Sequence, residues 1–171
     1  MNAIKLLRTM HADAKMRFRL ILGSDNPQEA ATMWQQLQPV LKLHEQMEDT
    51  YLYGPLQKQL LPGSVLGDYE QQHHADVALV DGLIQGTAEL KAGTPPWRMQ
   101  VAQINDLLAR HIMDEEGQIF PRIEQVWDGE RLEQAGQKMA AMQAGAPVVD
   151  LPEKAKALVD KAKDAISDIR S

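Results

Sequence analysis

Apolar residues recur at steps of three and four along four long stretches of the chain, whereas the alternating pattern of half-buried strands is nearly absent. Clusters of Gly, Pro, Asn and Asp separate these stretches. The pattern predicts helices over about residues 2–22, 27–61, 65–90 and 95–127. Four such helices with short connections predict an all-α, up-down-up-down four-helix bundle about 30 Å or more in length.

Two shorter helices are expected after the bundle. Residues 130–143 and 152–170 carry helical patterns, and in the second of these apolar residues line one side and lysines the other. We interpret that last helix as a surface helix that packs on the bundle. The chain is therefore divided into a four-helix bundle over residues 1–128 and a C-terminal helical extension over residues 129–171.

Length and composition restrict the class of protein. A chain of 171 residues with 44% hydrophobic and 25% charged residues is typical of one globular domain. A net charge of −6 offers no basic surface for nucleic acid. The chain has no cysteine, which excludes disulfides, iron–sulfur clusters and thiol chemistry. Any metal must therefore be held by nitrogen and oxygen.

The sequence also gives expectations about location. Charged residues are spread among the apolar ones in residues 1–23, so we find no secretion signal there. Elsewhere no stretch approaches the roughly 20 apolar residues that a membrane helix needs. We expect a cytoplasmic protein without a membrane or nucleic-acid partner.

One histidine lies on the apolar stripe of each predicted long helix: His11, His44, His111 and one of the adjacent pair His73 and His74. Each lies well inside its helix, and mid-helix positions of antiparallel neighbours come to similar heights in a bundle. The four side chains can therefore converge on one site. Between the adjacent pair His73 is preferred, because its face is continued by apolar residues, namely Val77, Val80 and Ile84.

Two of these histidines begin the same short pattern, in which a glutamate follows four residues later: His44 with Glu48, and His111 with Glu115. A spacing of four places both side chains on one helical face, one turn apart. The match continues into the apolar positions that follow, where Tyr53 pairs with Phe120. This similarity indicates an internal duplication of a helix pair.

The two glutamates point to bound cations. Two like charges about 4 Å apart repel by roughly 4 kcal/mol at an effective dielectric near 20, so Glu48 and Glu115 would need counter-ions if buried together. Imidazole and carboxylate ligands suit iron, with manganese or zinc also possible, and two bridging glutamates favour two metals over one. A lone inward histidine is more often a core residue, but the coincidence of four with two such pairs favours a metal site. We interpret Tyr51 as a packing residue with a hydrogen bond to the site.

These motifs resemble the hemerythrin-like HHE cation-binding family over about residues 2–127. The resemblance implies a non-haem di-iron centre, two iron ions bridged by carboxylate or oxo groups. It implies terminal ligands at the four histidines and bridges at the two glutamates: His11, His44, His73, His111, Glu48 and Glu115.

The sequence departs from the pattern of oxygen-carrying hemerythrins, which have a further histidine one turn after the third-helix ligand and a longer His-to-Asp spacing in the fourth helix. Here Val77 and Glu115 occupy those places. The resemblance therefore implies more open coordination positions, as in members linked to nitric oxide, peroxide or iron handling.

Rival metal sites fit less well. Ferritin-like di-iron oxidases use two Glu-x-x-His motifs, and here Glu70 with His73 is the one copy that fits. A zinc protease helix would read His-Glu-x-x-His, whereas the chain has glutamate, Glu48, in the last position.

The leading hypothesis is a di-iron protein that binds or reacts with a small diatomic or peroxidic ligand: O2, NO or peroxide. The alternative is a non-catalytic sensor of oxygen, redox state or iron, or an iron-binding module, that acts through the C-terminal helices. A metal-free structural bundle is the third hypothesis. Whether the protein is an enzyme stays open at this point.

Overall fold

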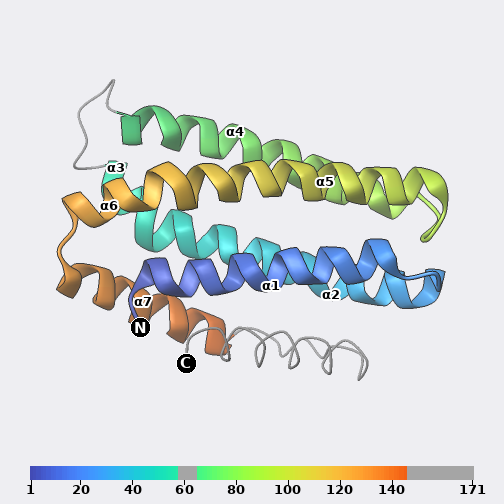
Figure 1. The fold of residues 1–171 in the computed structure, drawn as a ribbon, viewed down its shortest axis with the longest axis horizontal. Coiled ribbons are helices and arrows are strands. Elements are labelled where there is room, and N and C mark those ends of the chain that lie inside the picture. The colour runs from blue at the N-terminus through green and yellow to red at the C-terminus, as the bar shows by residue number, and fades with distance from the viewer. Residues whose placement is uncertain (58–64, 146–171) are drawn as a thin grey trace.

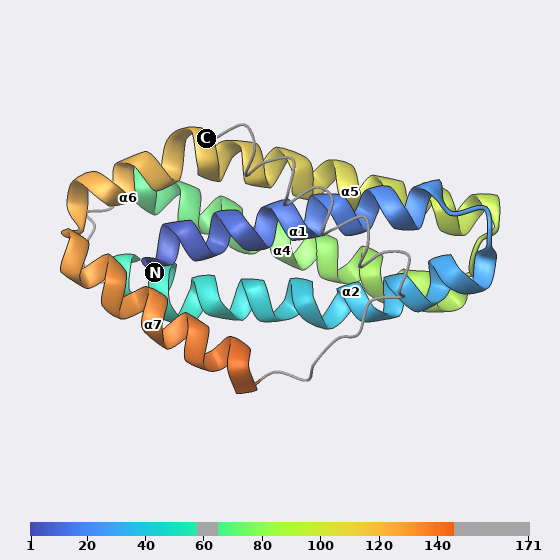
Figure 2. The same cartoon turned by 60° about the horizontal axis from the view of Figure 1, so that its bottom comes forward.

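The computed structural model describes residues 1–57 and 65–145, and it confirms the all-α bundle. Its four long helices are α1 (Ala3–Gly23), α2 (Pro27–Glu48), α4 (Val65–Gly86) and α5 (Pro95–Asp114). They run side by side along the long axis of the molecule (Figures 1 and 2). Successive helices run in opposite directions, as predicted. The expected helix over residues 152–170 lies outside the described residues.

Polar caps and a glycine turn set the helix ends. The Asn2 side chain accepts a hydrogen bond from the Lys5 backbone N–H, and the Asn26 side chain accepts bonds from the first turn of α2. The turn between α1 and α2 and the turn between α4 and α5 meet at one end of the bundle. In the second of these turns Gly93 has φ of 77°. A Cβ atom there would lie 2.4 Å from Pro27 Cβ, so the turn requires glycine.

Both helices that carry a His-x-x-x-Glu pattern change to π-helical geometry at the end of the pattern, directly after Glu48 in one and at Glu115 in the other. Helix α2 continues into η1 (Asp49–Tyr53) and then α3 (Gly54–Gln57). Helix α5 continues into η3 (Glu115–Ile119) and then α6 (Phe120–Val126). The sequence predicted two unbroken helices here, so the π segments correct that prediction. A short 3-10 segment, η2 (Thr87–Glu89), follows α4.

The core consists of two apolar clusters with a polar level between them. One cluster fills the end where the π segments lie, and it includes Leu7, Leu52 and Ile123. The other fills the opposite half around Phe18 and Trp97. On α1 the buried residues before His11 belong to the first cluster, and Phe18 and Ile21 after it belong to the second. Polar side chains are therefore buried midway along an apolar bundle.

Helix α7 (Gly129–Gly145) packs against the beginning of α1, beside the N-terminus (Figures 1 and 2). A Cβ atom on Gly136 would lie 2.3 Å from the Met1 carbonyl oxygen, so the close approach depends on glycine. The helix expected over residues 130–143 is thus present and lies on the bundle. Within the described ranges, no helix is long and apolar enough to cross a membrane.

Candidate metal centre

Six potential ligand residues converge in the middle of the bundle, one histidine from each long helix and two glutamates. They form two overlapping groups, within each of which the ligand atoms lie within 4.8 Å of one another. Glu48 and Glu115 belong to both groups. The first group adds His11 and His44, and the second adds His73 and His111. The structure therefore brings together all six residues predicted from the sequence, in two sets that share their carboxylates.

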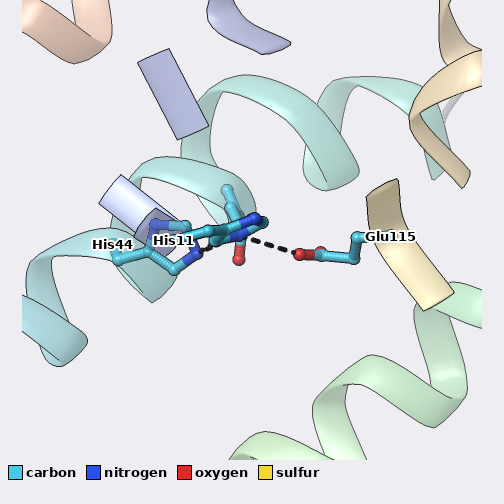
Figure 3. Close-up of side chains that lie close together, drawn as sticks. His11, His44 and Glu115 are labelled. Atoms are coloured by element: carbon cyan, nitrogen blue, oxygen red, sulfur yellow. Dashed lines mark hydrogen bonds and ion pairs between the residues drawn. The ribbon is translucent and has the colours of Figure 1, made fainter. Parts of the chain in front are cut away.

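Three residues of the first group, His11, His44 and Glu115, lie with their polar atoms toward one another (Figure 3). His11 Nε2 lies 3.1 Å from His44 Nε2 and 3.2 Å from Glu115 Oε2. His44 Nε2 lies 3.2 Å from Glu48 Oε1. Two ligands that each lie about 2.1 Å from one cation, at right angles, are about 3 Å apart. The spacing of these donors thus fits a single cation between them.

The second group is slightly more open. His111 Nε2 lies 3.4 Å from Glu115 Oε1, and the His73 and His111 ring centroids are 5.1 Å apart. His73 is 0% exposed, whereas its neighbour His74 lies on the exposed side of α4. The face of α4 that carries His73 is therefore the one turned toward the other donors.

Several buried polar atoms in this cluster have no hydrogen-bond partner among the described residues: Glu48 Oε1, Glu115 Oε2 and both ring nitrogens of His73. Leaving a buried polar atom unsatisfied costs about 1–3 kcal/mol. Nitrogen and oxygen lone pairs that face one another in this way are satisfied by a cation between them. The donor set therefore fits bound metal better than it fits an empty core.

The surroundings also move the pKa values of the cluster. Burial and the nearby Glu115 carboxylate raise the pKa of Glu48 well above its usual range. Burial alone would raise the pKa of Glu115 too, but the neighbouring His111, His11 and His44 lower it to about 2.

Two of the histidines are kept neutral by their surroundings. Burial and His111 lower the pKa of His73 to about 4, and burial lowers the pKa of His44. At neutral pH both rings are therefore uncharged, which leaves a lone pair available for a cation.

Comparison with known proteins agrees with this geometry. The sequence model of the family described as hemerythrin HHE cation binding domain matches residues 2–123, which include every residue of the cluster. The chain belongs to this family. No curated protein and no solved structure matches the chain. Family membership and the cluster together establish a cation-binding HHE domain that extends from α1 into α6.

Two further residues of the HHE domain hold the cluster from outside. Glu116 Oε1 lies 2.8 Å from His11 Nδ1, the ring nitrogen that faces away from the other donors. The Tyr53 hydroxyl donates a hydrogen bond to Glu115 Oε1, at 2.5 Å. Such outer partners fix the orientation of side chains that bind metals. Glu116 and Tyr53 are therefore positioning residues of the site.

Neither of these residues was predicted from the sequence. We expected Tyr51 to bond to the site, but among the described residues the tyrosine hydroxyls that contact it are those of Tyr53 and, at 3.4 Å from His111 Nδ1, Tyr69. In a regular helix a residue five positions after Glu48 is turned away by about 140°. The π segment closes its hydrogen bonds from residue i to i+5, which brings Tyr53 back toward the face of Glu48. For Glu116, the acidic pair Glu115-Glu116 was visible in the sequence, but its contact with α1 was not.

Proposed function

We propose that the chain is a non-haem di-iron protein that binds or reacts with a small ligand, O2, NO or peroxide, at a carboxylate-bridged pair of iron ions. The observation that carries the proposal is the presence of two donor groups that share Glu48 and Glu115. One cation would need a single group, whereas two groups with common carboxylates fit two cations side by side. Manganese or zinc would satisfy the same donors.

The number of donors leaves room for a ligand. Each proposed ion would receive two imidazole nitrogens and oxygens from the two shared glutamates. Iron often takes six ligands, so positions stay open for a small molecule. Bound iron would supply the redox chemistry. The side chains would hold the ions. Burial keeps His44 and His73 neutral, and the four buried donors, His11, His73 and the two glutamates, would have little contact with bulk water.

Metal analysis of iron-loaded protein tests the proposal. We expect about two equivalents of iron per chain, together with charge-transfer absorption that changes between oxidised, reduced and azide-treated samples. Binding of well under one equivalent, without such absorption, would instead support a metal-free structural bundle.

The adjacent histidines of α4 provide a matched pair of variants. His73→Ala should lose at least one equivalent of iron, because it removes a donor from the second group. His74→Ala changes the exposed neighbour and should keep the iron content of the unmodified protein. Equal iron loss in both variants would contradict the assignment of His73.

Ligand turnover separates an enzyme from a binding protein. Iron-loaded protein is mixed with NO or peroxide, and both the bound spectrum and the ligand remaining in solution are followed. Steady consumption supports an enzyme. Stoichiometric binding without consumption supports carriage or sensing.

One observation favours a sensor as the second candidate. Helix α7 packs on α1, which carries His11, and also on η1, which carries Tyr53. A change at the metal centre could therefore reach the C-terminal extension through direct contacts. Hydrogen exchange of α7, measured in metal-free, reduced and oxidised protein, tests this candidate. Identical exchange in the three states would remove it.

A further inference from the structure

A cavity of about 510 Å³ adjoins the candidate metal centre. His11, His44 and His111 line it at one end, and Phe18 and Ile84 line it further along the bundle. Phe18 is seven residues beyond His11 on α1, which corresponds to about 10 Å along the helix. The cavity thus extends about two turns from the donors into the other half of the bundle.

The cavity is much larger than a diatomic ligand or peroxide requires. A water molecule, which is close to these ligands in size, occupies about 30 Å³ in the liquid. Pockets for organic molecules range from about 300 to 1,000 Å³. A volume of 510 Å³ therefore corresponds to an organic molecule rather than to O2, NO or peroxide alone.

The walls of the cavity are mostly apolar beyond the donors. Ala14 lies one turn after His11, and Val77 lies one turn after His73, in the place where the sequence lacks a further histidine. Val80, Leu107 and Leu108 continue this lining. The space next to the metal centre is thus shaped by small and aliphatic side chains, which bind an apolar molecular body.

Access to the cavity is easiest between α2 and α4. Helix α1 packs closely on α2 and on α5, and α4 packs closely on α5, whereas α2 and α4 make far less contact. Glu45 and Lys42 of α2 and Asp81 of α4 line the cavity on this side. Acidic side chains outnumber basic ones there, so an anionic ligand gains no net attraction on entry.

We propose that this cavity is a binding site for a neutral, largely apolar organic molecule, held with one end at the metal centre. Binding of the organic molecule depends on the cavity alone. A role of this molecule as co-substrate rests on the proposed function, because the molecule would meet a small ligand at the iron pair. Binding to the cavity and binding of iron are tested by separate measurements.

Displacement of a neutral fluorescent probe tests the binding site. N-phenyl-1-naphthylamine is titrated into the protein with and without iron. It is then displaced from the metal-free protein by 1-octanol or by octanoate, which share a chain length, so that no cation holds the octanoate carboxylate. We expect saturable binding at one site per chain, and stronger displacement by 1-octanol. Absence of saturable binding overturns the proposal, and stronger displacement by octanoate overturns its neutral ligand class.

Two alanines of α1 provide a matched pair of variants. Ala14 is buried and lines the cavity, whereas Ala12, two residues earlier, is exposed. Ala14→Phe should weaken probe binding by about tenfold or more, because its ring occupies ligand space. Ala12→Phe should leave probe binding unchanged, and equal effects would overturn the location of the site. Circular dichroism checks that both variants fold.

Iron content is measured on the same samples, which keeps the two proposals distinguishable. Probe binding without bound iron would remove the di-iron function and leave the cavity site. Bound iron without probe binding would remove the cavity site and leave the di-iron function.

Discussion

Tyr53 and Phe120 occupy equivalent places in the two repeats of the HHE domain, each five residues after a shared glutamate. Phe120 stacks on the His11 ring with centroids 5.7 Å apart, and Tyr53 lies against the His73 ring at 4.6 Å. The tyrosine alone of this pair carries a hydroxyl, and it donates to Glu115. The repeats therefore place their two carboxylates in different surroundings.

Removal of that hydroxyl should destabilise the metal-free protein. Tyr53→Phe makes the two repeats alike and deprives the buried Glu115 carboxylate of its donor. We expect the free energy of unfolding to fall by about 1–3 kcal/mol, measured by urea denaturation with a chelator present. Tyr51→Phe removes a hydroxyl from a half-buried tyrosine in the same segment and should change stability by less than about 0.5 kcal/mol. Similar losses in both variants would contradict the role of Tyr53.

Glu116 is expected to act on metal affinity. Its carboxylate holds His11 through Nδ1, so Glu116→Ala frees the ring to rotate. The expected result is metal affinity about 10- to 100-fold weaker, measured by competition with a chelator of known affinity. The control is Glu124→Ala, which removes an exposed carboxylate from α6. Unchanged affinity in Glu116→Ala would show that packing alone orients His11.

The sequence predicted the six donors because each of them follows from position along one helix. Spacing of four places His44 beside Glu48 on a face, and the apolar stripe selects His73 over His74. The structure brings these donors together, and their role as ligands belongs to the proposed function. Glu116 could not be assigned in this way, because its contact with His11 joins residues 105 positions apart.

At the scale of elements, the π segments decide what surrounds the donors. The segment begins directly after Glu48 in one repeat and at Glu115 in the other, and its i→i+5 hydrogen bonds turn Tyr53 and Phe120 toward the site. Sequence predicted the four long helices and the start of each, because caps, prolines and apolar periodicity are local signals. The hydrogen bonds of an α turn join residues four positions apart, and those of a π turn join residues five apart. Side-chain packing decides between the two turns, and this packing cannot be read from a local sequence pattern.

Two glycines near the π segments should respond in opposite ways to alanine. A Cβ atom on Gly54 would lie 2.5 Å from the Asp49 carbonyl oxygen, the acceptor that closes η1, whereas a Cβ on Gly117 in η3 meets open space. Gly54→Ala should therefore lower the free energy of unfolding by about 1–3 kcal/mol. Gly117→Ala should raise it by about 0.4–1 kcal/mol, because alanine restricts the unfolded chain. Urea denaturation of both variants measures the difference, and a loss in Gly117→Ala equal to that in Gly54→Ala would contradict it.

At the scale of the whole molecule, the fold buries two carboxylates between two apolar clusters. Glu48 is 1% exposed and Glu115 is 0% exposed, and their ligand atoms lie within 4.8 Å of each other. Like charges about 4 Å apart repel by roughly 4 kcal/mol at an effective dielectric near 20. Bound cations would offset this repulsion in the middle of the bundle. Metal loading should therefore add to stability by an amount that grows with the logarithm of the metal affinity.

Glu48→Gln should consequently have opposite effects with and without metal. In metal-free protein the amide needs neither a buried charge nor the uptake of a proton on folding, so we expect the free energy of unfolding at neutral pH to rise by about 1–3 kcal/mol. The raised pKa of Glu48 fixes the pH dependence. The penalty for ionised Glu48 is fully present above that raised pKa and fades as pH falls toward 4.5, the ordinary value for a glutamate. The gain from glutamine should therefore shrink as the pH is lowered through this range.

In metal-loaded protein the same substitution should lower stability, because an amide is a weaker ligand than a carboxylate and both donor groups contain Glu48. Thermal unfolding with saturating metal, set beside unfolding with a chelator, measures both signs on one variant. Glu124→Gln removes an exposed charge and should show neither effect. A Glu48→Gln protein that is less stable without metal would mean that the ionised carboxylate stabilises the empty bundle. Bound cations would then not be needed to offset buried charge, even with all six donors in place.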